Sequence, residues 1–284
     1  MPNITPTNDL LFKKMLSSVE NKDILQGLIA DFFKLHVPLE DIEIATPYSI
    51  ETYTEALNAS GGDATSVMRH IASDIRASLK FADFLSDVQV KKDKYFSPRS
   101  LLYTFQKFCD NYNSQRAMEY DIHGKAVKYS SLRPVYTLNV LEYSHYPDED
   151  GLRIFRMYDY ERGKAFDKEW VNIGFFELNK KNYETAAHKH WRELFKTGKA
   201  SKDAPEYIKK AASVVDYVNL KKEERDMISR EEWAEDTIQA VTQTAYEDGQ
   251  ERVLDMVLAG YTADQIKAAL REERWQEGAR HDIT

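Results

Sequence analysis

Residues 70–90 (HIASDIRASLKFADFLSDVQV) constrain the fold more than any other part of the chain. Both halves alternate apolar and polar side chains with the period of two that is typical of a β-strand, and the chain reverses around Lys80. In the second half, Val88 and Val90 share one face. The opposite face carries Asp87, Gln89 and, one step further on, Lys91. We therefore expect an antiparallel hairpin with one apolar and one polar face.

The remaining segments predict helices at both ends of the chain and further strands between them. Helical spacing of apolar residues indicates a helix in 5–16, with Thr7 as N-cap, and a second helix in 21–36. Residues rich in β-branched and aromatic side chains predict strands at 41–50, 133–143, 152–161 and 171–179. From about residue 183 onward the pattern is helical, and Gly260, Thr262 and Gln265 mark a turn between the last two helices.

A further helix is predicted over residues 97–112, where Ser97 is a cap and Pro98 the first helical residue. Its apolar stripe, expected to be buried, consists of Leu101, Leu102, Phe105, Phe108, Cys109 and Tyr112. The other face presents Arg99, Tyr103 and Gln106, which could meet an anion. The whole pattern predicts an α/β protein with a mixed sheet flanked by helices. We divide it into a domain of residues 1–195 and a helical region of residues 196–284.

Composition and charge narrow the classes of function. The net charge of −8 argues against a generic nucleic-acid binder, but residues 91–133 hold nine basic and four acidic side chains, a local net of +5. Residues 221–284 hold nine basic and sixteen acidic side chains, a net of −7. The single cysteine, Cys109, excludes an internal disulfide and fits a reducing cytoplasm. The first residues lack a signal-peptide pattern, and no apolar stretch is long enough for a membrane span.

Asp74 and Asp87 are the candidates for chemistry, because neighbouring strands would point both carboxylates to one face. Mg²⁺ prefers one or two carboxylates, a carbonyl such as that of Val88, and water. Gln89 and Lys91 would then flank the metal, where they could orient a water or contact a phosphate. The alternative is that these carboxylates are simply hydrated on an exposed sheet face. His188 and His190, two residues apart on a helix, would point to different sides and are interpreted as a surface pair.

The ordered set of segments resembles the recombination-promoting nuclease, or transposase-like, branch of the PD-(D/E)XK nuclease superfamily. The similar segments are TNDLLFKKML, SDIRASLKFADFLSDVQV, KYFSPRSLLYTFQKF, LRPVYTLNVLEY, FFELNKK and YEDGQERVLDMVLAGYTADQIKAAL. The resemblance implies a restriction-endonuclease-like fold and a DNA endonuclease that depends on Mg²⁺, or Mn²⁺ in its place. It also implies a role in DNA recombination, with DNA as partner and no membrane.

Carried over by position, the family's metal-binding acids fall on Asp74 and Asp87, its motif glutamine falls on Gln89, and Asp9 is the candidate acid of the first helix. Asp87 departs from the family pattern, since glutamate is usual there. The residues that we expect to contact DNA are Lys92, Arg99, Tyr103 and Lys107. Two alternatives stay open: a nuclease fold that binds DNA or a partner without cutting, and a protein-interaction module acting through the C-terminal helices, which could also form a homodimer.

Overall fold

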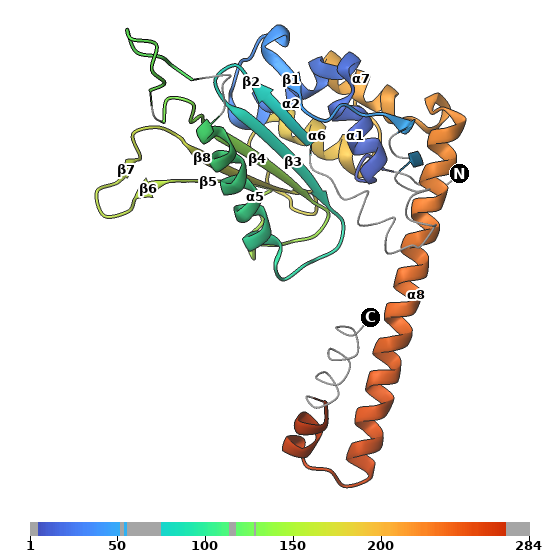
Figure 1. Ribbon diagram of the computed structural model, residues 1–284. Coiled ribbons are helices and arrows are strands. Elements are labelled where there is room, and N and C mark those ends of the chain that lie inside the picture. Colours follow the sequence, from blue (N-terminus) through green and yellow to red (C-terminus); the bar gives the residue numbers. More distant parts are fainter. Residues whose placement is uncertain (1–4, 52–53, 56–74, 114–117, 128, 271–284) are drawn as a thin grey trace.

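A computed structural model describes residues 5–51, 54–55, 75–113, 118–127 and 129–270 (Figure 1). A mixed six-stranded sheet lies at its centre, in the order β1-β2-β3-β4-β8-β5. The strands are β1 Ile42–Ile44, β2 Ile75–Leu79, β3 Asp83–Gln89, β4 Val135–Leu141, β5 Leu152–Arg156 and β8 Val171–Glu177. Strands β3, β4 and β8 are parallel, whereas β1, β2 and β5 pair antiparallel with their neighbours.

The predicted hairpin is confirmed, because β2 pairs antiparallel with β3 and Ile75 stands opposite Ser86. β3 lies inside the sheet, between β2 and β4, and most of its residues are buried. Every residue of β4 and of β8 is buried, as expected for parallel strands with helices on both faces. A separate two-stranded hairpin, β6 Tyr158–Asp159 and β7 Lys164–Ala165, projects beyond β5 (Figure 1).

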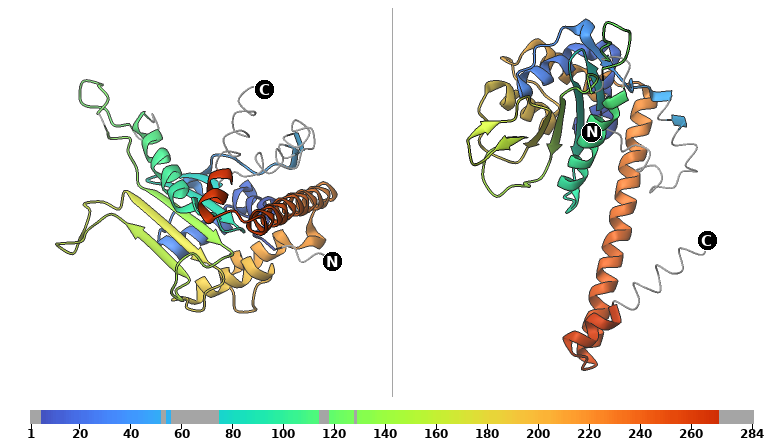
Figure 2. Two further views of the ribbon diagram at one scale, coloured as in Figure 1. Left: turned by 90° about the horizontal axis from the view of Figure 1, so that it is seen from below. Right: turned by 60° about the vertical axis from the view of Figure 1, so that its left-hand side comes forward.

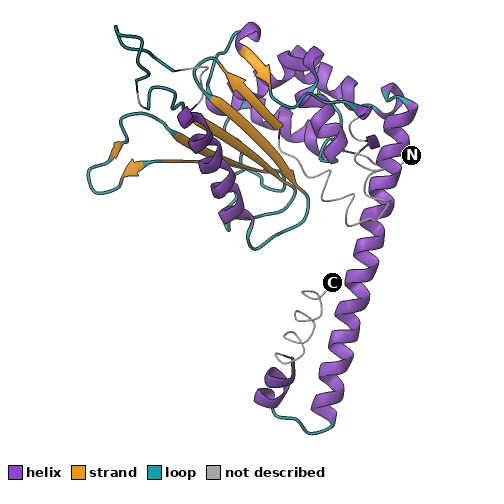
Figure 3. Ribbon diagram, viewed as in Figure 1, coloured by secondary structure: helices purple, strands orange, loops and turns teal. Residues whose placement is uncertain are grey.

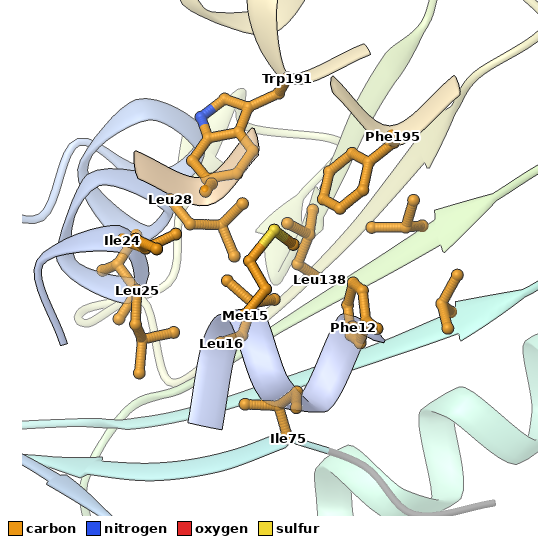
Figure 4. Packing of buried hydrophobic residues seen from close by; sticks show 14 of the residues in the cluster. Phe12, Met15, Leu16, Ile24, Leu25, Leu28, Ile75, Leu138, Trp191 and Phe195 are labelled. Atoms are coloured by element: carbon orange, nitrogen blue, oxygen red, sulfur yellow. The ribbon is translucent and has the colours of Figure 1, made fainter. Parts of the chain in front are cut away.

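The main hydrophobic core fills one face of the sheet. It is covered by α1 Asp9–Ser17, α2 Lys22–Phe33, α6 Ala186–Thr197 and α7 Glu206–Val215. Figure 4 shows Leu28 beside Trp191, with Met15 and Phe12 of α1 and Leu138 of β4 in the same core. The N-cap of α1 is Asn8 and not Thr7: the Asn8 side chain accepts from the backbone N–H of Leu11. Short 3₁₀ turns are η1 Val19–Asn21, η2 Leu39–Asp41, η3 Asn111–Asn113 and η4 Tyr217–Asn219.

Helix α5 (Phe96–Asp110) covers the other face of the sheet, over a small second core that contains Phe96, Leu141 and Phe175. Its orientation contradicts the predicted burial. The side chains that it turns to the sheet are Phe96, Ser100 and Thr104. The apolar residues expected to be buried lie outside instead: Leu101, Leu102, Phe105, Cys109 and Tyr112 are exposed, and Phe108 is half-buried. Hydroxyl contacts to β4 replace apolar packing, since Thr104 bonds Thr137 at 2.8 Å and Ser100 bonds Asn139 at 3.1 Å.

The core continues beyond residue 195, where the sequence pattern placed a boundary, because Ile208, Ala211 and Ile228 are also part of it. The long helix α8 (Lys222–Leu258) starts on this core and then leaves it (Figures 2 and 3). Glu224, buried near its start, accepts from Lys14 at 2.7 Å and from the Tyr48 hydroxyl at 2.9 Å. The predicted turn is confirmed: Gly260 has a φ of 85°, and Thr262 and Gln265 form reciprocal capping bonds. Within the described residues, no helix is long and apolar enough to cross a membrane.

One buried carboxylate joins the sheet to α5. Asp83, at the start of β3, is fully buried. It accepts from Ser78 at 2.9 Å and from Asn111 at 2.8 Å, and it forms ion pairs with Arg133 at 3.2 Å and Lys107 at 3.4 Å. These donors come from β2, from α5 and the turn after it, and from the segment that enters β4. The charge pairs therefore stabilise the packing of three segments that are far apart in the sequence.

We predict that Asp83→Asn lowers the free energy of unfolding by about 3 kcal/mol, because removing one partner of a buried ion pair leaves the remaining charges uncompensated. Urea unfolding measures the loss. Asp110→Asn, at an exposed position on α5, is the matched control and is expected to change stability by less than about 0.5 kcal/mol. If Asp83→Asn also lowers the free energy of unfolding by less than about 0.5 kcal/mol, the buried network contributes little to stability.

Candidate functional site

The candidate site lies toward the carboxyl ends of β3, β4 and β8, on the face that α5 covers. Asp87 and Gln89 alternate with Val88, whose side chain points into the main core, so the two polar side chains point to the α5 side. Asp87 stands opposite Asn139 of β4. The polar face predicted from the sequence is therefore present in β3, and Asp87 and Gln89 are half-buried between strand and helix.

Asp87 and Gln89 form one chain of hydrogen bonds with α5. The Gln89 amide donates to Oδ2 of Asp87 at 2.8 Å, and the backbone N–H of Val88 donates to Oδ1 at 2.9 Å. The guanidinium of Arg99 donates to Oε1 of Gln89 at 2.8 Å and forms an ion pair with Asp93 at 3.2 Å. Arg99 thus fixes which way the Gln89 amide faces, and the amide nitrogen points to the carboxylate.

A small pocket opens beside this chain between β3, β4 and α5. It is lined by Ser86, Asp87, Phe96, Arg99, Ser100, Tyr103, Thr137 and Asn139. The short side chains of Ser100 and Thr137 let the helix lie close to the strand, while Tyr103 stays 39% exposed at the rim. Asn139 was not among the predicted site residues; it is buried and donates to the carbonyl of Gly174 at 3.0 Å. An asparagine inside the apolar run TLNVL was a signal that could have identified it.

The start of α1 reaches the same end of the sheet. The Thr7 hydroxyl bonds the Glu142 carboxylate, and the backbone N–H of Glu142 donates to the carbonyl of Gln89 at 3.0 Å. Asp9, two residues after Thr7, forms an ion pair with the buried Lys13 at 2.8 Å. These contacts connect the first turn of α1 to β3 through the residue that follows β4.

The predicted basic residues divide into two groups. Lys91 and Lys92 follow β3 directly and are exposed, as is Lys94, which lies 4.6 Å from the centre of the Tyr95 ring. Lys107 lies two turns further along α5 than Arg99 and is engaged by the buried Asp83. Asp74 lies outside the described residues. The structure therefore brings Asp87, Gln89 and Arg99 together and gives Lys107 a partner away from them.

Tyr143 is a further residue of this region that sequence reasoning did not single out. It follows β4 and packs on the second core, beside Phe96 and Leu141. Burial raises the pKa of its hydroxyl, and the positive charge of Arg99 acts in the opposite direction.

The histidines of the HKHW segment point to different sides of α6, as predicted, but they do not form a surface pair. His188 is buried, stacks on Phe32 and lies 3.2 Å from the carbonyl oxygen of Asp31. Burial lowers its pKa. His190 bonds Ser201 at 2.9 Å on the other side. Among the described residues, no group of three or more histidines, cysteines and acids could hold a metal ion.

The strand order, the parallel β3-β4-β8 core and the helices on both faces define a restriction-endonuclease-like α/β fold. The model of the PD-(D/E)XK nuclease family transposases matches residues 6–245, and the chain belongs to this family. The match ends within α8, so the likeness of segment 246–270 to a family tail stays a prediction. A search of curated proteins finds no match for this chain, and neither does a search of solved structures.

Proposed function

We propose that the protein is a metal-dependent DNA endonuclease whose site is built from Asp74, Asp87 and Gln89. The main support is Asp87 beside Gln89 and Arg99 at the carboxyl end of β3, in a member of a nuclease family. The β2–β3 ladder is described as far as the pair Ile75–Ser86. Ser86 immediately precedes Asp87 in β3, and Asp74 immediately precedes Ile75 in the sequence.

The donor chemistry fits Mg²⁺, with Mn²⁺ as a substitute. Carboxylate and backbone carbonyl oxygens are the hard ligands that Mg²⁺ takes, and it keeps several waters and substrate oxygens as the rest of its shell. Asp74, Asp87 and the Val88 carbonyl would hold it, with Asp9 as an added acid from the first turn of α1. A bound cation supplies a hydroxide nucleophile at neutral pH and stabilises negative charge on the scissile phosphate.

The other residues position the reactants in this proposal. Gln89, fixed by Arg99, orients the attacking water, and Lys91 neutralises phosphate charge beside it. Tyr103 at the pocket rim contacts the nucleic acid, and Lys92 and Lys94 extend the positive charge beyond the end of β3. A role in DNA recombination follows from the family's transposases and is part of the same proposal.

A second candidate function is a nuclease fold that binds DNA without cutting it. It is favoured by Asp87, whose side chain is one methylene shorter than the glutamate usual in the family. It is also favoured by the hydrogen bond that Gln89 donates to the same carboxylate. The two functions differ in turnover and share the DNA partner, so cleavage assays separate them.

The first functional prediction is that Asp74→Asn and Asp87→Asn each abolish cleavage of supercoiled plasmid in Mg²⁺ and Mn²⁺ while thermal unfolding stays close to that of the parent protein. Ca²⁺ and EDTA are the negative conditions. Asp110→Asn is the matched control and should cut at the parental rate. Cleavage at the parental rate by either site variant would move the metal site elsewhere.

The second functional prediction concerns Asp87→Glu, which restores the usual family residue. If the aspartate holds the cation loosely, the longer side chain should raise the cleavage rate at limiting Mg²⁺ and lower the Mg²⁺ concentration for half-maximal rate. A Mg²⁺ titration of the initial rate measures both. A lower rate at every Mg²⁺ concentration would show that this site is adapted to the shorter acid.

The third functional prediction separates DNA-binding charges from structural charges. Removing one cation that binds a phosphate should flatten the dependence of log K on log salt by about 0.9. The double variant Lys91→Ala/Lys92→Ala should therefore flatten the slope by about 1.8 and keep the parental stability, because both side chains are exposed. Lys107→Ala should lower stability and leave the slope unchanged, since Lys107 pairs with the buried Asp83. Fluorescence anisotropy across a salt series measures the slopes. A flatter slope for Lys107→Ala, together with an unchanged slope for the double variant, would place the DNA-binding surface along α5.

A further inference from the structure

The outer face of α5 is an apolar stripe open to solvent. The exposed fractions are 47% for Leu101, 62% for Leu102, 41% for Phe105 and 37% for Tyr112, and Cys109 is exposed between them. Tyr129, which is 61% exposed, packs on Tyr112 with ring centres 5.1 Å apart and extends the stripe past the end of the helix. We refer to these six residues as the α5 stripe.

The spacing of the apolar residues in the stripe is typical of a helix face that packs against another surface. Its α5 members recur three or four residues apart, as in a helix that buries one side against a partner. Yet the sheet side of α5 is occupied by Phe96, Ser100 and Thr104, so the intramolecular contact uses a different side of the helix. The largest apolar patch on a protein surface, typically about 300–600 Å², is often functional, so the stripe is a candidate interaction site.

We propose that the α5 stripe is a homodimer interface, in which the stripe of a second copy packs antiparallel on the first. Between Leu101 and Tyr112 the only charged residues are Lys107 and Asp110, and Lys107 is paired with the buried Asp83. Two copies that pack stripe against stripe therefore bring together nearly uncharged surfaces. DNA, by contrast, requires cations on the surface that it contacts.

The outer half of α8 is the competing surface, and its charge disfavours self-association. Its exposed apolar residues include Val241, Leu254 and Leu258. The acids Glu247, Asp248, Glu251 and Asp255 alternate with them, against one basic residue, Arg252. Two copies of α8 would bring these acids together, whereas two copies of α5 would not. We therefore assign the homodimer interface to α5 and not to the C-terminal helices, where the sequence led us to expect it.

The area of the stripe is sufficient for a pair. At about 200 Å² for a large side chain, the exposed fractions of Leu101, Leu102, Phe105, Tyr112 and Tyr129 amount to about 500 Å² per copy. A pair would bury about 1,000 Å², which is the lower end of what a specific interface needs. Phe105 lies near the middle of the stripe, so in an antiparallel pair it would face its own copy, with Cys109 one turn away.

The test measures the mass of the full chain in solution by sedimentation across a wide range of protein concentration. We expect a dimer for the parent protein and a monomer for Phe105→Glu and for Leu102→Glu. Glutamate is a good helix former and both positions are exposed, so the variants should keep the parental circular dichroism. Val241→Glu on α8 is the matched control and should remain dimeric.

Cross-linking gives a second readout because Cys109 is the only cysteine. A short bismaleimide should link two copies of the parent protein, and should not link Phe105→Glu or Cys109→Ser. A parent protein that is monomeric at all concentrations would overturn the proposal. So would a dimer that survives Phe105→Glu, or one that only Val241→Glu dissociates, which would assign the interface to α8. None of these readouts depends on nuclease activity.

Discussion

The buried charge of Asp83 is the interaction on which the placement of α5 depends. A carboxylate fully removed from water must be met by donors or cations, and the four that meet it come from separate segments. Lys107 and Asn111 bring the end of α5 to the start of β3, and Arg133 brings the segment that enters β4. With that end fixed, the other end of α5 lies where Arg99 reaches Gln89.

The polar contact between α5 and the sheet explains why a pocket remains beside Asp87. Large apolar side chains in place of Ser100 and Thr104 would hold the helix further from β4 and fill the space beside Asp87. The hydroxyls let the helix approach closely while the polar groups of Asn139 and Thr137 are satisfied. The same orientation of α5 leaves its large apolar residues on the outside. The polar lining of the pocket and the exposed stripe therefore both result from which side of α5 faces the sheet.

The start of α1 and the base of α8 meet near the sheet end that carries the candidate site. Asn8, which caps α1, donates to Glu231 of α8 at 2.7 Å, and Lys14 binds Glu224 one turn into the same helix. Thr7 bonds Glu142, which continues β4. The first turn of α1 is therefore held between the sheet end that carries the candidate site and the base of α8.

Elements whose periodicity depends on local sterics and on the burial of one side could be predicted from the amino-acid sequence. The β2–β3 hairpin, the two fully buried strands β4 and β8, and the Thr262–Gln265 cap could all be predicted, because a period of two or a short polar motif has one structural solution. The pairing of Asp87 with Gln89 on one face followed from the same alternation. The family resemblance then supplied the expected chemistry.

The buried side of α5 could not be predicted from the sequence, because helical periodicity identifies an apolar side but not what covers it. The stripe from Leu101 to Tyr112 predicts burial equally well against the chain's own sheet or against another surface. The ion-pair partners of Lys107 and Arg99 could not be predicted from the sequence for a related reason. Long cationic side chains can reach acids on other segments of the fold, here Asp83 of β3 and Asp93 before α5. His188 was likewise expected at the surface and lies against Phe32, since contacts between helices set its burial.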